Sequence, residues 1–191
     1  MTSRLVLLGP PGAGKGTQAG RISDALGVPA ISTGDIFRQN VAQQTELGRR
    51  AQRYMDAGEY VPDEVTNAMV RDRLAEEDAQ GGFLLDGYPR TADQVAELDG
   101  MLTAAGTQLD VVVELTADTD EVVTRLLQRA KEQGRADDTE VVIRRRLEVY
   151  AEQTAPLAQI YADRGLLVQV DGMGDIESVT ERLLAALPSA R

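Results

Sequence analysis

The segment GPPGAGKGTQ, residues 9–18, is the clearest indication of how this chain folds. It follows the short apolar run RLVLL, which is typical of a strand buried on both faces, and it leads into a segment with helical spacing, residues 17–26. From Gly9 to Lys15 the glycines and the lysine have the G-x4-G-K spacing of a phosphate-binding loop. In such a loop backbone N–H groups surround an anion, the next helix directs its positive end at it, and Lys15 reaches the β- and γ-phosphates.

This segment has two other interpretations. GKGTQA, residues 14–19, formally matches the dinucleotide fingerprint G-x-G-x-x-A, but it lies too far past the end of the strand. A Gly/Pro turn that binds nothing is the second alternative. Ser or Thr usually follows the lysine of a phosphate loop, whereas here Gly16 precedes Thr17, which leaves metal ligation by that hydroxyl in doubt. The order strand, loop, helix favours the phosphate loop.

The composition restricts the chemistry that the chain can perform. Its 191 residues include no cysteine and no histidine, which excludes disulfides, thiolate catalysis, cysteine-built zinc sites, Ser-His-Asp triads and imidazole acid–base catalysis. The net charge of −11 argues against general nucleic-acid binding. No apolar run approaches the ~20 residues of a membrane span, and no signal-peptide pattern precedes Arg4. We therefore expect a cytoplasmic protein that binds neither nucleic acid nor membranes.

Apolar strands alternate with helical segments along the rest of the chain. The expected strands are residues 4–9, the GGFLLD run, residues 110–115 and residues 166–172; the expected helices are 17–26, 91–102, 118–131, 139–164 with a bend near Pro156, and 176–187, with several short helices broken at Gly48, Gly58 and Pro62 between Thr33 and Glu77. This alternation predicts one α/β domain with a parallel sheet covered on both faces. Ligands bind beyond the carboxyl ends of such strands, where residues 9–15 and 86–90 both lie.

Two further motifs carry polar residues to that edge. STGDIFR, residues 32–38, begins a helix with Thr33 and Asp35, which an N-cap with an acidic first turn explains equally well. DGYPRTADQ, residues 86–94, ends the second strand with Asp86, where a nucleotide-bound magnesium ion would sit. Gln94 also has a purely structural explanation, because Thr91-x-x-Gln94 is a capping box.

Arginines gather around the polar loop EQG. They are Arg125, Arg129 and Arg135, which flank the loop, and Arg144, Arg145 and Arg146 on the next helix. A solvated helix face explains part of the pattern, since Glu121/Arg125 and Glu140/Arg144 are favourable i,i+4 pairs. Three consecutive arginines point about 100° apart around a helix, so they cannot all serve one site. In so acidic a chain this concentration predicts an anionic ligand, and the rigid fork of arginine suits phosphate oxygens.

Taken together, these motifs resemble the adenylate kinase family, whose members convert ATP and AMP into two ADP. The resemblance covers essentially the whole chain: GPPGAGKGTQ, STGDIFR, DGYPRTADQ, GRADD with RRRLEVY, and VDGMGD occur in the family's order, and the GKGT departure is itself a family feature. It implies an α/β, three-layer P-loop NTPase fold with a central five-stranded parallel sheet, a helical NMP-binding insert and a short lid. The implied parts are a core (1–31, 62–127 and 139–191), the insert (32–61) and the lid (128–138).

The resemblance also implies roles for individual residues. The ATP site would comprise Gly12, Ala13, Gly14, Lys15, Gly16, Thr17, Arg125, Arg129 and Gly174. The AMP site would comprise Thr33, Arg38, Glu59, Tyr60, Val61, Gly87, Tyr88, Pro89, Arg90, Gln94, Arg135 and Arg146. Lys15, Arg90, Arg129, Arg135 and Arg146 would be catalytic, and Asp35 and Asp86 would hold Mg²⁺ through its waters. The substrates would be ATP, AMP and ADP, and the protein would be a monomer without zinc.

Two other functions stay open. A UMP/CMP kinase would share the fold and the arginines, although Thr33 and Gln94 favour adenine, because an amide can pair with both an acceptor and a donor of that base. A P-loop switch or regulatory ATPase would have no second substrate; the sequence lacks the guanine-reading N-K-x-D and has more arginines than one triphosphate requires. Phosphoryl transfer suits a chain without histidine, since the acceptor oxygen is already ionised and catalysis consists of alignment and charge stabilisation.

Overall fold

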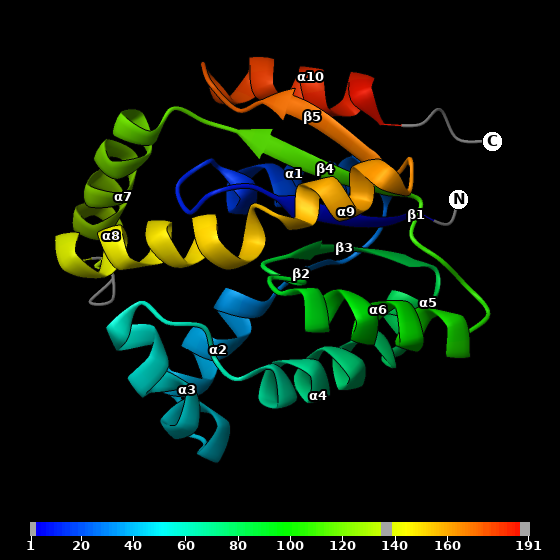
Figure 1. Ribbon diagram of the computed structural model, residues 1–191, viewed down its shortest axis with the longest axis horizontal. Helices are drawn as coiled ribbons and strands as arrows, with labels where there is room; N and C mark the ends of the chain where they lie inside the picture. Colours follow the sequence, from blue (N-terminus) through cyan, green and yellow to red (C-terminus); the bar gives the residue numbers. More distant parts are fainter. Residues whose placement is uncertain (1–2, 135–138, 188–191) are drawn as a thin grey trace.

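A parallel sheet of five strands forms the centre of the molecule, in the order β2-β3-β1-β4-β5 (Figure 1). The computed structural model describes residues 3–134 and 139–187. The strands are β1 (Ser3–Leu8), β2 (Ala30–Ser32), β3 (Gly82–Asp86), β4 (Val111–Thr116) and β5 (Leu167–Asp171). The run RLVLL is continuously apolar because β1 lies between β3 and β4 and both of its faces are covered.

Two layers of helices enclose this sheet. Alternate residues of β1 point to opposite faces: Val6 and Leu8 belong to one core cluster, Leu5 and Leu7 to the other. The helices that contribute to the first cluster are α4 (Asp63–Leu74), α6 (Ala92–Ala104) and α9 (Leu157–Asp163), and those of the second are α1 (Lys15–Leu26) and α10 (Ile176–Ala186). The expected three-layer α/β fold with a five-stranded parallel sheet is therefore confirmed.

Further helices surround the carboxyl edge of the sheet. They are α2 (Thr33–Ala42), α3 (Glu46–Ala57), α7 (Thr119–Gln133) and α8 (Glu140–Val149), with a π-helical turn η1 (Tyr150–Thr154) after α8. The short helix α5 (Glu77–Gln80) instead directly precedes β3, at the amino end of that strand. In Figure 1, α7 lies beyond the arrowhead of β4, and α2 and α3 lie below α8. None of the described helices has both the length and the apolar character that a membrane span requires.

The region of short helices differs from expectation at one glycine. Breaks are predicted at Gly48, Gly58 and Pro62; the last two are confirmed, but Gly48 lies inside α3. A Cβ at Gly48 would lie 2.1 Å from the backbone oxygen of Asn40 in α2, so this glycine permits close packing of two helices. The break falls instead before Thr45, whose hydroxyl accepts a hydrogen bond from the Gly48 N–H (3.0 Å) and caps α3.

Strand β2 is the element that the sequence pattern does not locate. It has only three residues, too few to display a strand periodicity. It is fixed by its parallel pairing with β3, in which Ile31 lies opposite Leu85, and by the burial of Ile31 in the core. The strand ends at Ser32, whose side chain caps α2 by accepting from the Asp35 N–H, and so it delivers the STGDIFR motif to the carboxyl edge.

The helical stretch predicted for residues 139–164 is divided in the structure. Helix α8 passes into the π-helical turn η1, and Pro156 then starts α9 as its N-cap. The bend near Pro156 is thus accompanied by a turn that is wider than an α-helical one. Its last residue, Thr154, is buried and faces the carboxyl edge of the sheet.

Candidate active site

One cleft of about 1040 Å³ brings together nearly every residue that the motifs predict for a site. Its lining includes these predicted residues: Gly12, Ala13, Gly14, Lys15, Gly16, Thr17, Thr33, Asp35, Arg38, Glu59, Tyr60, Val61, Asp86, Gly87, Pro89, Arg90, Gln94, Arg125, Arg129, Arg146 and Gly174. Residues that are far apart in the sequence thus meet at the carboxyl edge of the sheet, as expected for this class of fold. The volume lies at the upper end of the range of about 300–1,000 Å³ that is usual for a small-molecule pocket.

Two predicted residues are not brought into this lining. Arg135 lies outside the described residues. Tyr88 lies in the core, where its side chain is fully buried and its hydroxyl donates to Asn67 Oδ1 (2.8 Å). The Tyr88 side chain thus faces the core and not the cleft, and a contact of Tyr88 with AMP stays a prediction. Its neighbours Gly87 and Pro89 line the cleft instead.

The loop after β1 is shaped to surround an anion. Gly14 is the N-cap of α1, with a left-handed backbone (φ 94°) and no side-chain hydrogen bond to the first turn of the helix. Because glycine has no side chain, Gly14 cannot cap the N–H groups at the start of α1. The positive end of the α1 helix dipole lies at the cleft. Asp86, at the end of β3, faces the same place: its Oδ2 is 3.9 Å from the position that a Cβ would take at Gly16.

The side chain of Lys15 folds onto its own loop and binds two of the loop's carbonyl oxygens. Its Nζ donates to the carbonyl oxygens of Gly9 (2.8 Å) and Pro10 (3.1 Å). Burial lowers the pKa of Lys15 from its ordinary value of 10.5 to about 8; the carboxylate of Asp86 opposes this shift, while the guanidinium groups of Arg90 and Arg129 add to it. A phosphate ligand would supply the negative charge that this ammonium lacks.

Opposite the loop, the segment after β3 holds a group of interconnected polar side chains. The carbonyl oxygen of Gly87 accepts from both Thr33 Oγ1 (2.9 Å) and Arg90 Nε (2.7 Å). Gly87 has a left-handed backbone (φ 83°), and a Cβ there would lie 2.7 Å from Thr33 Oγ1 and 2.8 Å from an Arg90 guanidinium nitrogen. Only glycine at this position lets both side chains converge on the same carbonyl.

Thr154 of the π-helical turn connects the two sides of this group. Its hydroxyl donates to the backbone oxygen of Arg90 (2.8 Å) and lies 2.7 Å from the hydroxyl of Tyr60. Since a threonine hydroxyl has one hydrogen, Tyr60 is the donor of the second bond. The guanidinium carbon of Arg90 lies 5.0 Å from the centre of the Tyr60 ring, within the range of a cation–π contact. Sequence reasoning missed Thr154, whose partners are distant in the chain.

Gln94 is buried and both ends of its amide have protein partners. Its Oε1 accepts from the backbone N–H of Arg90 (2.7 Å), and its Nε2 donates to Asp63 Oδ1 (2.7 Å). Thr91 Oγ1 accepts from the Gln94 N–H (3.2 Å), so half of the predicted capping box is present. In the other half the Gln94 side chain would accept from the Thr91 N–H, and it contacts Arg90 instead. Asp63 is a second residue that sequence reasoning missed.

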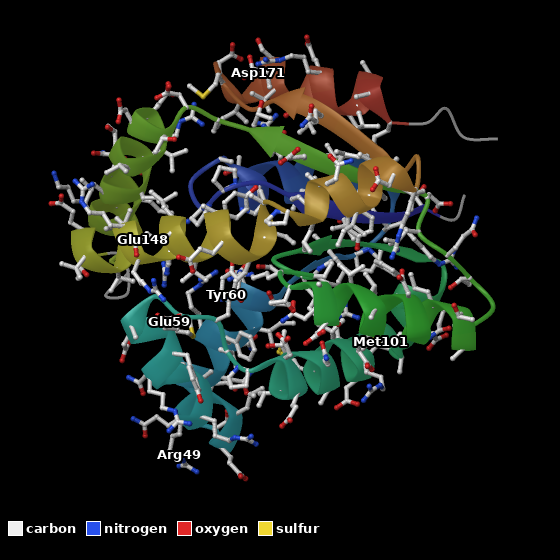
Figure 2. The ribbon with its side chains drawn as sticks, in the orientation of Figure 1. Arg49, Glu59, Tyr60, Met101, Glu148 and Asp171 are labelled. Carbon is white, nitrogen blue, oxygen red and sulfur yellow. The ribbon has the colours of Figure 1, made fainter. Side chains whose placement is uncertain are left out.

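The three consecutive arginines of α8 serve three different places. Arg144 pairs with Glu140 of its own helix (2.8 Å), and Arg146 lines the cleft. Arg145 pairs with Glu59 (2.6 Å), the residue that follows the end of α3 at Gly58. Figure 2 shows Glu59 and Tyr60 between α3 and α8. The predicted divergence of these side chains around the helix is confirmed.

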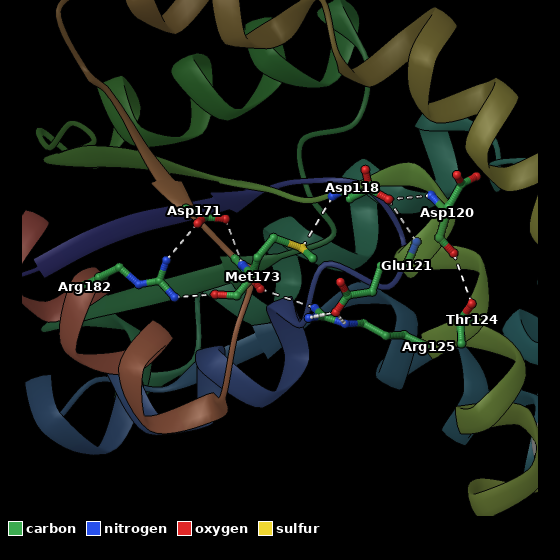
Figure 3. Close-up of polar contacts among 9 residues, drawn as sticks. Asp118, Asp120, Glu121, Thr124, Arg125, Asp171, Met173 and Arg182 are labelled. Carbon is green, nitrogen blue, oxygen red and sulfur yellow. Dashed lines mark hydrogen bonds and ion pairs between the residues drawn. The ribbon is translucent and has the colours of Figure 1, made fainter.

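A set of polar contacts fixes the loop between β5 and α10, next to the start of α7 (Figure 3). Asp171 accepts from the Met173 N–H (3.0 Å) and from Arg182 (3.0 Å), and Arg182 also donates to the Met173 oxygen. Arg125 donates to the oxygen of Gly172 (3.3 Å) and pairs with Glu121 (2.6 Å). These contacts hold the backbone at Gly174 along the cleft.

A divalent cation would find carboxylates but no complete set of protein ligands here. Asp86 and Asp35 both line the cleft, and Asp35 forms an ion pair with Arg38. Among the described residues there is no group of three or more His, Cys, Asp or Glu side chains that could hold a metal ion. The donors present fit Mg²⁺, which keeps several waters and binds one or two carboxylates together with substrate phosphates.

Known proteins with similar sequences agree with this geometry. The adenylate kinase family model matches residues 7–166. The chain is 69% identical over 185 residues to the adenylate kinase of Kocuria rhizophila, covering 97% of this chain and 98% of the relative. It is 65% identical over 184 residues to the adenylate kinase of a Nocardioides species (96% of each chain) and 61% identical over 189 residues to that of Renibacterium salmoninarum (99% and 98%). The chain belongs to the adenylate kinase family.

Proposed function

We propose that this protein transfers the γ-phosphoryl group of Mg-ATP to AMP, reversibly, to give two ADP, and that the cleft described above is where it does so. The observation that carries the proposal is the coexistence, in one cleft, of a phosphate loop and a separate group of polar and cationic side chains opposite it. A protein that only hydrolyses or senses one triphosphate would not need the second group. The division of the chain into core, insert (32–61) and lid (128–138) remains part of this proposal.

On the loop side, the proposed ATP contacts are Gly12 to Thr17, Arg125, Arg129 and the backbone of Gly174. The uncapped start of α1 would bind the phosphates, as helix N-termini do. Lys15 would exchange its two carbonyl contacts for phosphate oxygens. The loop at Gly174 would meet the adenine ring through its backbone, which the contacts of Arg182 and Asp171 keep in place.

On the opposite side, the proposed AMP contacts come from the insert and from the segment after β3. The side chains would be Thr33, Arg38, Arg90 and Gln94, with backbone from Glu59 to Val61 and from Gly87, and Arg146 reaching from α8. Arg135 belongs to the same proposal by resemblance alone. Gln94 has a spare acceptor and a spare donor, which match the N6 amino group and N1 of adenine.

Catalysis would consist of alignment and charge neutralisation rather than proton transfer. Lys15, Arg90, Arg129 and Arg146 all line the cleft and would stabilise the charge on the transferring phosphoryl group. Asp35 and Asp86 would hold Mg²⁺ through its waters, and the bound ion would supply further neutralisation of the β- and γ-phosphate oxygens. Closure of the insert and lid would exclude water, because an open site would hydrolyse ATP. We further propose a cytoplasmic monomer that uses no zinc.

Phosphorus NMR of the purified protein tests the proposal directly. Mg-ATP is supplied with AMP and, in separate samples, with CMP, UMP or GMP. We expect rapid formation of ADP with AMP alone. Formation of ADP together with CDP or UDP would indicate a pyrimidine monophosphate kinase. Release of inorganic phosphate at a rate independent of the acceptor would place the protein among ATPases.

A further inference from the structure

We infer that Asp63 determines the orientation of the Gln94 amide and thereby makes the acceptor site select 6-aminopurine over 6-oxopurine monophosphates. Asp63 is the first residue of α4, two positions after the proposed insert (32–61); its carboxylate accepts from Thr91 and Gln94, and it is not among the residues that line the cleft. The inference rests on the proposed function, because it assumes that Gln94 reads the base of the acceptor. Asp63 would thus be a positioning residue that acts through Gln94.

Two independent contacts fix which end of the amide is oxygen. The backbone N–H of Arg90 can only donate, so the Gln94 atom 2.7 Å from it must be the oxygen. A carboxylate can only accept, so the atom 2.7 Å from Asp63 Oδ1 must be the nitrogen. Reversing the amide would place two donors together at Arg90 and two acceptors together at Asp63. Because Gln94 is almost fully buried, solvent would not relieve either clash.

Asp63 is itself fixed by a hydrogen bond from Thr91, the N-cap residue of α6. Its second oxygen, Oδ2, accepts from Thr91 Oγ1 (2.9 Å), and Thr91 also caps α6 by accepting from the Gln94 N–H (3.2 Å). The three side chains therefore form a closed set in which each hydrogen bond has one possible direction. This set joins the start of α4 to the start of α6 directly behind the amide that lines the cleft.

The fixed amide still has one hydrogen on its nitrogen and one lone pair on its oxygen for a ligand. This donor and acceptor match the edge of adenine, which offers the N6 amino group as donor and N1 as acceptor, in that order. Guanine and hypoxanthine offer the reverse order, O6 as acceptor and N1–H as donor. A 6-oxopurine would therefore bind well only to the reversed amide, which the contacts with Asp63 and Arg90 oppose.

The test compares AMP with IMP, whose base differs from adenine only at this edge. The specificity constant kcat/KM is measured for both acceptors in the wild type, in Asp63→Ala and in Asp63→Asn. We expect the preference for AMP over IMP to fall about tenfold in Asp63→Ala, where nothing opposes the reversed amide at that end. A smaller fall is expected in Asp63→Asn, a substitution of equal size whose amide can present either an oxygen or a nitrogen to Gln94.

Glu64→Gln is the matched control. Glu64 is the next residue of the same helix turn, is exposed, and lines a separate groove. The substitution Glu64→Gln should leave the ratio of kcat/KM for AMP to kcat/KM for IMP unchanged. If Asp63 has only a structural role, both specificity constants fall together and the ratio stays at the wild-type value, which would overturn the inference. Failure of the proposed function is distinguishable, since the wild type itself would then form no ADP from AMP.

Discussion

The two sides of the cleft are built in different ways. The loop side, residues 9–17, is one continuous stretch in which the backbone and Lys15 face the ligand, and the polar contacts of Lys15 Nζ are with carbonyls of its own loop. The network side consists of Thr33, Tyr60, Arg90, Gln94 and Thr154, which come from separate elements and hydrogen-bond to one another or to shared partners. One side is organised by local sequence and the other by long-range contacts.

This difference predicts how each side responds to substitution. Within residues 9–17 a single side chain, that of Lys15, carries a positive charge that can bind phosphate. Its removal should abolish activity without disturbing the fold. On the network side several side chains contribute to binding and catalysis. Each single substitution should therefore lower activity by only part of the total, and some of the loss should appear as weaker AMP binding.

The largest effect is expected for Lys15→Met. We expect kcat to fall about a thousandfold, as for loss of a preorganised charge-stabilising group, while the unfolding temperature does not fall. The reason is that burial disfavours the ammonium, so that a methionine of similar length relieves a cost. A coupled assay for ADP and thermal unfolding measure the two quantities. Lys131, the other lysine of the sequence, is exposed and supplies the control Lys131→Met. Normal turnover in Lys15→Met would contradict the assignment.

The next largest effect is expected on the network side, for Arg90→Ala. We expect activity at least about a hundredfold lower, with the fold retained. The reason is that Arg90 lines the cleft and that its guanidinium lies over the ring of Tyr60. Some of the loss should appear as a raised KM for AMP, unlike the loss in Lys15→Met. Arg71→Ala, which removes an exposed arginine paired with Glu97, is the control. Near-normal turnover of purified Arg90→Ala protein would refute its proposed role.

The same contrast explains what could be predicted from the sequence. The phosphate loop and the long apolar strands follow from local spacing, and the structure has them where they are expected. The contacts Tyr60–Thr154 and Asp63–Gln94 join residues 94 and 31 positions apart, and no local pattern reports such pairs. Gly48 shows a different limit, because glycine marks either a helix break or close packing and only tertiary structure separates the two.

A third prediction concerns the contact that joins the network side to α8. Replacing Arg145 by Gln, or Glu59 by Gln, should raise the KM for AMP by about fivefold or less with little change in kcat, since the pair holds the segment before Tyr60 against α8. The modest size follows from exposure, because both side chains are more than a third accessible. Initial-rate kinetics with AMP as the varied substrate measure the effect.

The neighbouring residue provides the control for this pair. Arg144→Gln removes an arginine that, among the described residues, pairs with Glu140 of its own helix, and it should leave the KM for AMP unchanged. If Arg145 and Glu59 act through their contact, the double variant should be no worse than either single one. Additive effects would mean that the two residues act separately.

The smallest effect belongs to the loop side and depends on pH. Because burial lowers the pKa of Lys15 to about 8, the free protein loses this charge above that pH, whereas bound phosphate should keep it protonated. ATP binding should therefore weaken about threefold between pH 7.5 and 8.5 and take up a proton, which calorimetry in buffers of different ionisation enthalpy detects.

The free energy of unfolding should change in the opposite direction and increase with pH. The unfolded state binds the proton up to its pKa of 10.5, so the cost of burying the charge is fully present below about pH 8 and is relieved between pH 8 and 10.5. Lys15→Met should lack both trends, and their persistence in that variant would assign them to another group.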